Sequence, residues 1–289
     1  DGSYSNYTCN WQLSNTGPGN TNCAKWDGAY VNLPAGRNAI SIDATYDHTC
    51  AILDNSSLVC WGINNVGQLG DGTACQQYVN WNGCVGKDDY VKPNPVFVDL
   101  GGEKVTSVSV NYPGNCATVY SGKVYCWGAG SLIGNQSHYN DSSKWGHCTA
   151  TNPQCARPVE VTLPPERSAV AASVGKNTAC AIMDNGSVMC WGNSGSGEFG
   201  DGSYPGTGSY DRISPDYVSL PTEREAISLS NGRDHVCALL DNNSVMCWGA
   251  NRYGQLGNGL SNNVYTGAAS YSDWANNSAY PVYVNFSGP

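Results

Sequence analysis

The sequence predicts an all-β protein, a β-propeller-like array of four full four-stranded blades plus a partial N-terminal blade, stapled by disulfides. One phrase recurs four times along the 289 residues, and each copy holds two cysteines ten positions apart. The segments between are short and apolar with glycine-rich corners, and they show no helical periodicity. An invariant cysteine spacing inside repeats of unequal length indicates a geometric requirement within each repeat.

The repeated phrase divides the chain into one continuous repeat domain. It begins as HTCAILDNSSLVCWGINNVGQLGDGT at His48 and returns at Asn115, Ala179 and Val236. The predicted divisions are a partial blade or junction segment over residues 1–39 and repeats over 40–103, 104–167, 168–224 and 225–289.

The two cysteines of each pair lie in the two strands of a predicted β-hairpin. Apolar residues lie on both sides of a three-residue turn such as Asp54-Asn55-Ser56, and the third residue of such a turn is left-handed. With this turn the two cysteines face each other across the strands, ~4.5–5.5 Å apart at Cα, which is within disulfide range. The predicted hairpin disulfides are Cys50–Cys60, Cys116–Cys126, Cys180–Cys190 and Cys237–Cys247.

Both faces of each hairpin are apolar. Cys50, Ile52 and Leu58 lie on one face, and Ala51 and Leu53 lie on the other. A strand pair that is apolar on both faces is buried between neighbouring sheets. We therefore expect every hairpin to pack between two blades.

Further short strands are expected on either side of each hairpin. Upstream they cover residues 40–42, 106–108, 170–172 and 227–229. Downstream they cover residues 98–100, 161–163, 218–220 and 284–286. Four short strands in ~60 residues, with glycine-rich corners between them, are typical of a propeller blade.

Six cysteines remain outside the hairpins: Cys9, Cys23, Cys75, Cys84, Cys148 and Cys155. They form local pairs in sequence order, and seven local disulfides would leave no free thiol. The spacing does not fix this connectivity. A zinc site is disfavoured, because the hairpins contain no CxxC spacing and no nearby pair of histidines.

Composition restricts the setting. Only 13% of the residues are charged, the net charge is −9 and the pI is about 4.7, which argues against a nucleic-acid partner. No apolar run approaches the ~18 residues of a membrane span. Because the chain begins at Asp1 without a signal-like stretch, we expect a processed or excised segment.

The cysteines and the N-glycosylation sequons favour an extracellular or cell-surface glycoprotein carrying N-linked glycans. Some sequons are expected by chance in a chain so rich in Asn and Ser. The sequons are Asn6, Asn55, Asn135, Asn140, Asn185, Asn242, Asn276 and Asn285.

The repeat resembles that of the regulator-of-chromosome-condensation family. The resemblance rests on the run from the first hairpin cysteine through Trp-Gly to Gly-Gln-Leu-Gly, seen at residues 67–70 and 254–257 and altered at 197–200 and 131–134. It implies a β-propeller, usually of seven blades, in which Gly-Gln-Leu-Gly is a tight packing corner. It also implies a structural role for the Trp-Gly tryptophans Trp61, Trp127, Trp191 and Trp248.

The chain departs from this family in blade number. It has four full repeats, and Tyr30–Leu33 matches only the tail of a fifth. Further blades are then expected from another chain or from a removed part of the precursor, unless the repeats form an open or smaller assembly. A shared fold alone says little about activity.

No catalytic constellation, cofactor site or metal site stands out, and we expect no enzymatic activity. His48 and His235 share one repeat position and are expected to be structural. The Asp71-Gly and Asp201-Gly turns indicate turn chemistry rather than calcium loops.

Long loops rich in Tyr, Trp, Asn, Gly and Ser are candidate interaction surfaces, since rigid rings among polar groups are typical of paratopes. Their rings are equally consistent with covering blade edges. The loops span residues 73–94, 135–157, 203–215 and 260–280. The candidate interaction residues are Tyr78, Trp81, Tyr139, Trp145, Tyr204, Tyr210, Tyr265, Tyr271 and Trp274.

Three functional classes remain, with a secreted enzyme ranked last. The favoured class is a structural subunit of an extracellular fibre or coat, assembled from copies of itself through heterologous contacts. The alternative is a soluble secreted propeller that binds or inhibits another protein. A polymer would favour the first class, and a monomer in solution would favour the second.

Overall fold

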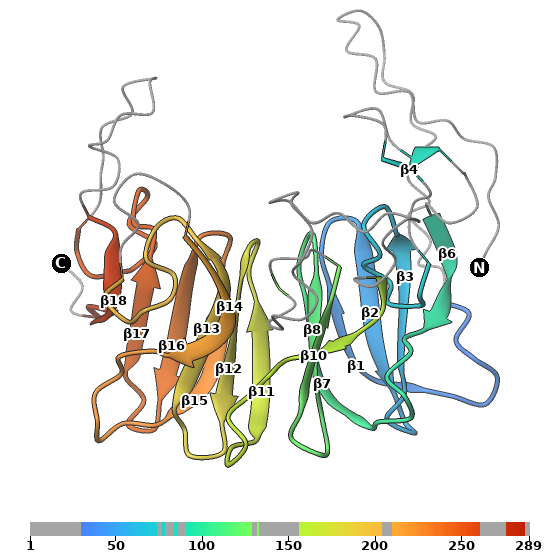
Figure 1. Ribbon diagram of the computed structural model, residues 1–289, viewed down its shortest axis with the longest axis horizontal. Coiled ribbons are helices and arrows are strands. Elements are labelled where there is room, and N and C mark those ends of the chain that lie inside the picture. Colours follow the sequence, from blue (N-terminus) through green and yellow to red (C-terminus); the bar gives the residue numbers. More distant parts are fainter. Residues whose placement is uncertain are drawn as a thin grey trace, which may run out of the picture.

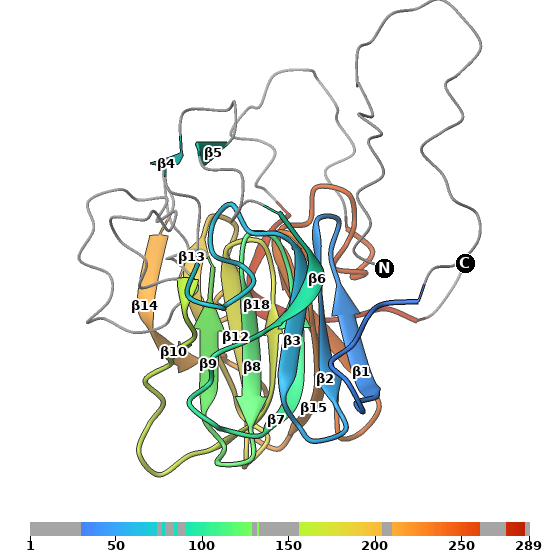
Figure 2. The same ribbon diagram turned by 90° about the vertical axis from the view of Figure 1, so that its right-hand side faces the viewer.

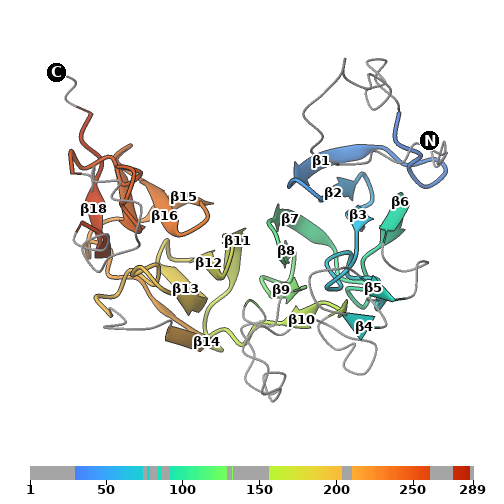
Figure 3. The same cartoon turned by 90° about the horizontal axis from the view of Figure 1, so that it is seen from above.

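Four antiparallel sheets stand side by side as the blades of an arc (Figures 1 and 3). The structure, a computed structural model, describes residues 30–73, 91–128, 132, 156–203, 210–260 and 276–286. It also describes the backbone of the short strands β4 (Gln77–Tyr78) and β5 (Cys84–Val85). The predicted fold class is confirmed.

Each blade contains four strands in sequence order. Blade 1 consists of β1 (Ala39–Ala44), β2 (His48–Leu53), β3 (Leu58–Ile63) and β6 (Val91–Phe97). Blade 2 consists of β7 (Val105–Val110), β8 (Asn115–Val119), β9 (Val124–Trp127) and β10 (Val159–Glu160). Blade 3 consists of β11 (Ala169–Val174), β12 (Thr178–Met183), β13 (Val188–Ser194) and β14 (Tyr210–Tyr217). Blade 4 consists of β15 (Ala226–Asn231), β16 (His235–Leu240), β17 (Val245–Gly249) and β18 (Ser278–Tyr283).

The first strands of the blades, β1, β7, β11 and β15, form the inner side of the arc (Figure 3). Figure 2 shows the strands of neighbouring blades standing in roughly the same direction. Seen from above, the arc is open between blade 1 and blade 4 (Figure 3). Within the described ranges, no helix is long and apolar enough to cross a membrane.

The predicted hairpin disulfides are confirmed in all four blades. Cys50 pairs directly with Cys60 across β2 and β3, and all four disulfides have a Cα–Cα distance of 4.1 Å. The turn that sets this register has a left-handed third residue, with φ of 64° at both Ser56 and Asn243. The other six cysteines lie outside the described residues, except for the backbone of Cys84.

The prediction for the downstream strands was wrong in position. In blade 1 the fourth strand ends at Phe97, so residues 98–100 lie beyond it. The Val98 N–H still donates to the Leu58 carbonyl at 3.0 Å, but the Asp99 N–H donates to the Gly70 carbonyl at 3.2 Å. From Asp99 on, the backbone therefore bonds to the glycine-rich corner instead of to the neighbouring strand, and the strand ends.

The core lies between blades rather than within them. In the cluster between blades 1 and 2, Ile52 and Leu58 of blade 1 pack with Val119 and Trp127 of blade 2. Equivalent clusters join blade 2 to blade 3 and blade 3 to blade 4. The expectation that each hairpin packs between two blades is thus met by the hairpins of blades 2 and 3, whereas those of blades 1 and 4 each meet one neighbouring blade among the described residues.

Glycine follows each repeat tryptophan because a side chain at this position would clash with the backbone. Gly62 has φ of 117°, and a Cβ on it would lie 2.5 Å from the Asp47 carbonyl oxygen. The next residue, Ile63, donates its N–H to that same carbonyl at 2.9 Å. Only glycine allows this close approach of two backbone segments.

Candidate functional site

The repeat tryptophans link each blade to the corner of the blade before it. Their rings are fully buried in blades 2, 3 and 4. Each indole N–H donates to a backbone carbonyl in the corner of the preceding blade. The links are Trp127 to Gln68 at 3.0 Å, Trp191 to Leu132 at 2.9 Å and Trp248 to Glu198 at 2.8 Å. The corner is therefore an acceptor for the next blade.

Three other kinds of hydrogen bond, each with a backbone N–H donor, recur between successive blades. The carbonyl of the left-handed turn residue accepts from the first residue of the next blade, as in Val105 N–H to Ser56, Ala169 to Gly122 and Ala226 to Gly186, all at 2.8 Å. A side-chain oxygen on the inner strand accepts from the next inner strand, as in Val110 N–H to Asp43 at 2.8 Å, Val174 to Ser109 at 3.1 Å and Asn231 to Ser173 at 3.0 Å. The N–H of the second glycine in the Gly-Asp-Gly turn donates to the outer part of the next blade. Gly72 donates to the carbonyl of Ala156, which precedes β10, at 3.0 Å, and Gly202 donates to that of Ala279 in β18 at 2.9 Å.

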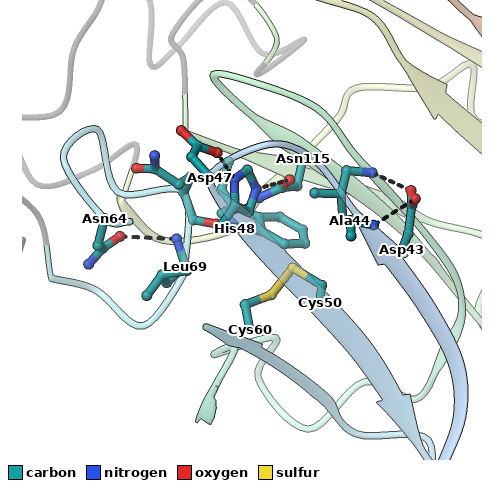
Figure 4. The surroundings of a disulfide bond; sticks show 12 residues. Asp43, Ala44, Asp47, His48, Cys50, Cys60, Asn64, Leu69 and Asn115 are labelled. Atoms are coloured by element: carbon teal, nitrogen blue, oxygen red, sulfur yellow. Dashed lines mark hydrogen bonds and ion pairs between the residues drawn. A yellow bond between two sulfur atoms is a disulfide. The ribbon is translucent and has the colours of Figure 1, made fainter. Parts of the chain in front are cut away.

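Buried amide side chains shape the corner of blade 1. Asn64 Oδ1 accepts from the Leu69 N–H at 3.0 Å, and Gln68 Oε1 accepts from the Val66 N–H at 2.9 Å (Figure 4 shows the first). A Cβ on Gly70 would lie 2.8 Å from the Trp127 indole nitrogen. Glycine at this position is thus required for the neighbouring blade to approach.

Blade 3 replaces both amides. Ser194 stands where blade 1 has Asn64, and Glu198 stands where it has Gln68. The Ser194 hydroxyl donates to Glu198 Oε2 at 2.6 Å, and the Ser196 N–H donates to the same oxygen at 2.7 Å. Burial raises the pKa of the Glu198 carboxyl despite these hydrogen bonds. This acidic side chain is therefore held by the backbone donor that binds an amide oxygen in blade 1 and by a second donor, the Ser194 hydroxyl.

His48 joins blade 1 to blade 2, which agrees with its predicted structural role. Its ring nitrogens lie 2.7 Å from Asp47 Oδ1 and 2.8 Å from Asn115 Oδ1 (Figure 4). Asn115 Nδ2 donates in turn to the Gln68 carbonyl at 2.6 Å. Sequence reasoning missed Asn115, because the other repeats have Thr49, Ala179 and Val236 at this position.

Blade 1 has one face that meets no preceding blade among the described residues, which we call the blade 1 end face (Leu33, Ala39, Ala51, Leu53 and Trp61). Ala51 and Leu53 on this face are nevertheless 0% exposed. Ala39 is exposed, whereas its counterpart Val105 is 2% exposed. Trp61 is only partly buried, and in the described part of the chain its indole nitrogen has no hydrogen-bond acceptor. Leu33 packs with Ala51 and Leu53. The face has the composition of an internal blade contact, and the part of the chain that the structure describes places no preceding blade against it.

Blade 4 presents the opposite uncovered face, the blade 4 end face (Leu239, Val245, Gln255, Gly259 and Phe286). Leu239 and Val245 are partly exposed, whereas their blade 3 counterparts are 2% and 0% exposed. Phe286 is 72% exposed, whereas its counterpart Leu100 is 7% exposed. A Cβ on Gly259 would meet no atom within 4 Å, whereas one on the equivalent Gly72 would lie 2.9 Å from Arg157.

The other predicted site residues are mostly outside the described ranges. For the nine candidate aromatic residues, only the backbones of Tyr78 and Tyr210 are described. Sequons Asn6, Asn135 and Asn140 also lie outside. Those at Asn55, Asn185 and Asn242 occupy exposed hairpin tips, where each Oδ1 accepts from the sequon serine hydroxyl at 2.6–2.7 Å. Asn285 is exposed, and Asn276 is partly exposed.

The remaining polar features give no reason to place a ligand. Within the described ranges, no three metal-ligating side chains gather. Asp71 Oδ1 accepts from the Thr73 N–H at 3.0 Å and from its hydroxyl at 2.6 Å, which is the turn chemistry predicted for this Asp-Gly pair. A surface hollow of about 420 Å³ over blade 2 has Lys123 and Glu160 at its rim, 2.9 Å apart and paired with each other.

Comparisons with known proteins agree with this architecture. The regulator of chromosome condensation (RCC1) repeat matches residues 39–68, 169–198 and 226–255. The ultraviolet-B receptor UVR8 of Arabidopsis thaliana is 25% identical over 220 residues, covering 76% of this chain and 43% of the receptor. The guanine nucleotide exchange factor SRM1 of Saccharomyces cerevisiae is 27% identical over 237 residues, covering 76% of this chain and 46% of the factor. The chain thus spans less than half the length of these two relatives.

Solved structures show the same fold. The structure of Prp20p from Saccharomyces cerevisiae superimposes with a TM-score of 0.66 at 16% identity, covering 87% of this chain and 52% of that one. Human WBSCR16 gives a TM-score of 0.62 at 18% identity, covering 86% of this chain and 53% of that one. Identities this low establish the fold alone.

Proposed function

Because the chain folds into four propeller blades, three of which match the RCC1 repeat, we propose that it is a non-catalytic module that works by assembly. It is a structural subunit of an extracellular fibre or coat, joined to its neighbours through its ends. The observation that carries this proposal is the pair of end faces, which meet no further blade among the described residues. Trp61 on one face and Leu239 and Val245 on the other are more exposed than their counterparts between blades.

An exposed apolar face beside a sheet is a site for association with another protein. The two end faces differ, so contact between them is heterologous and continues from copy to copy until a ring closes. A fibre or coat is the product when the ring does not close.

The hairpin disulfides and exposed sequons support an extracellular setting. Disulfides persist in oxidising compartments, and four of them lie in the described blades. Guanine nucleotide exchange, the activity in the name of the yeast relative, is not extended to this chain, which covers 46% of that protein.

The test is the state of the purified chain. Light scattering and electron microscopy of the oxidised protein should show a polymer or sheet at micromolar concentration. Deleting residues 1–38, which ends just before β1, should release single subunits because it removes Leu33 from the blade 1 end face. Replacing Leu33 with Asp offers a smaller change at the same place, and the thermal midpoint of each variant shows whether it still folds. A monomer at every concentration would contradict assembly and favour a soluble binding or inhibitor module.

A further inference from the structure

We infer that Tyr46 and Tyr112 form a site of oxidative crosslinking, at which a peroxidase and hydrogen peroxide join the two phenol rings as a dityrosine. Tyr46 lies in the loop between β1 and β2, and Tyr112 lies in the loop between β7 and β8. The ring centroids are 5.3 Å apart and the ring planes are inclined at 56°, so the two rings are in contact. The inference goes beyond the proposed function and does not depend on assembly, since it concerns two blades of one chain.

The two tyrosines hold the same position of the repeat, in the loop between the first and second strands of a blade. In blade 1 this loop is closed at its base by the Thr45 N–H, which donates to the His48 carbonyl at 3.0 Å, and blade 2 has the equivalent bond. Blades 3 and 4 have Lys176 and Arg233 at the tyrosine position. Among the described blades, the pair of tyrosines therefore falls between blades 1 and 2 alone.

A buried hydrogen bond fixes the bases of the two loops relative to each other. His48 lies two positions after Tyr46, at the start of β2. Asn115 lies three positions after Tyr112, at the start of β8. A ring nitrogen of His48 is 2.8 Å from Asn115 Oδ1, and both residues are buried (Figure 4). The contact of the two tyrosine rings is therefore a consequence of how the folded blades pack.

Both rings are accessible to an oxidant. Tyr46 is 79% exposed, and Tyr112 is partly exposed. Exposed side chains change rotamer within picoseconds to nanoseconds, so small rotations bring the ring carbons together repeatedly. Because the partner ring is always at hand, coupling within the chain does not wait for two molecules to collide.

The coupling step balances with one molecule of hydrogen peroxide. The peroxidase removes one electron from each phenol, and each phenolic O–H loses its proton. A carbon–carbon bond then forms between the two Cε atoms ortho to the hydroxyls. The hydrogen on each of these carbons moves as a proton to the oxygen of its own ring, which restores both aromatic rings and both hydroxyls. Hydrogen peroxide accepts the two electrons and the two protons and becomes two molecules of water.

The crosslink joins two blades, which the hairpin disulfides do not. Each of the four hairpin disulfides connects neighbouring strands of one blade across ten sequence positions. A bond from Tyr46 to Tyr112 closes a much longer loop, because the two residues are 66 positions apart in the sequence. The oxidised pair is therefore a covalent link between blades 1 and 2.

Mass spectrometry of the purified, disulfide-bonded chain tests the site. The chain at micromolar concentration is treated with a peroxidase and limiting hydrogen peroxide, then reduced, alkylated and digested with trypsin. The peptides that contain Tyr46 and Tyr112 should be found joined, with the loss of two hydrogen atoms. In a mixture of isotopically light and heavy chains, crosslinks within one chain should exceed crosslinks between chains about 100-fold, because the effective concentration of the neighbouring ring is at least millimolar.

Tyr46→Phe should abolish the joined peptide, since it removes the hydroxyl that is oxidised and keeps the packed ring. The thermal midpoint of the untreated variant shows that it still folds. Tyr120→Phe is the matched control. Tyr120 is 73% exposed in the turn after β8, at the opposite end of that strand from Tyr112, so its loss should leave the joined peptide unchanged.

Two results would overturn the inference. One is the absence of the joined peptide when the same peroxidase couples free tyrosine under the same conditions. The other is dityrosine that forms only between chains, or only at other tyrosines, so that Tyr46→Phe and Tyr120→Phe give the same yield.

Discussion

The indole nitrogen of Trp248 donates a 2.8 Å hydrogen bond to the backbone carbonyl of Glu198, which lies 50 residues earlier in the preceding blade. The tryptophan packs in the cluster between the two blades, so one side chain contributes both apolar burial and a hydrogen bond. The same link recurs at Trp127 and Trp191 but has no counterpart at Trp61 among the described residues. This asymmetry gives matched pairs of variants within one chain.

Trp248→Phe should destabilise the dilute monomer by about 1–3 kcal/mol, because it leaves the buried Glu198 carbonyl without its donor. Trp61→Phe should cost less than about 1 kcal/mol under the same conditions, since it breaks no such bond. Urea unfolding followed by fluorescence and circular dichroism measures both. Equal losses would show that the inter-blade hydrogen bond contributes nothing.

Gly70→Ala should be more destabilising than Gly257→Ala. Both glycines are left-handed, with φ of 68° and 62°, and a Cβ on either would lie 2.9 Å from a valine methyl. Only at Gly70 does the added Cβ also meet a tryptophan, Trp127. The backbone strain, about 1–2 kcal/mol, is common to the two variants. The difference between their thermal midpoints therefore reports the blade contact, and identical midpoints would argue against a tight corner.

Glu198→Gln should stabilise the protein at neutral pH. Because burial raises the pKa of Glu198 in the folded state, the folded protein retains a proton that the unfolded chain has already lost. Its contribution to stability is therefore present at low pH and is lost as the pH rises through the folded-state pKa. Glutamine stays neutral and can accept the same hydrogen bonds, as Gln68 does in blade 1.

Thermal midpoints measured from below pH 4.5, the ordinary pKa of a glutamic acid, to pH 7 check this expectation. The advantage of Glu198→Gln should grow with pH. Glu223→Gln, at an exposed position, should show no such trend. An advantage independent of pH would mean that the carboxyl is not protonated on folding.

Removing one hairpin disulfide, Cys180→Ala with Cys190→Ala, should lower the free energy of unfolding by about 2–4 kcal/mol. The disulfide lies in the cluster between blades 3 and 4, so packing loss adds to the loss of the crosslink. We also expect no free thiol in the whole denatured, unreduced protein. Stoichiometric labelling of Cys50 or Cys60 would contradict the hairpin disulfide between them.

At least one of Asn55, Asn185 and Asn242 should carry a glycan in the natural protein. All three are exposed at hairpin tips. Their Oδ1 atoms bind the sequon serine, and among the described residues the amide nitrogens, where a glycan is attached, have no hydrogen-bond acceptor. Peptide mass mapping checks occupancy, and bare asparagine at all three would weaken the case for a secreted glycoprotein.

The sequence predicted the blade strands and the hairpin disulfides because these depend on local spacing. Ten positions between two cysteines and a left-handed turn residue place Cys50 opposite Cys60, whatever surrounds the hairpin. The end of the fourth strand was not predictable in this way. It depends on Gly70, which is distant from Asp99 in the sequence. The Gly70 carbonyl accepts the hydrogen bond of the Asp99 N–H, so Asp99 does not pair with the neighbouring strand.

The sequence by itself therefore determined the repeat, its blades, its staples and the tail at Tyr30–Leu33. Only the tertiary structure decided that Trp61 and Leu239 are partly exposed while their equivalents between blades are buried, because burial depends on which blades stand next to each other. It also revealed Asn115 and Glu198, since a polar side chain at a single repeat position has no pattern to mark it. Local spacing fixes a blade, and packing between blades decides which of the equivalent positions are buried.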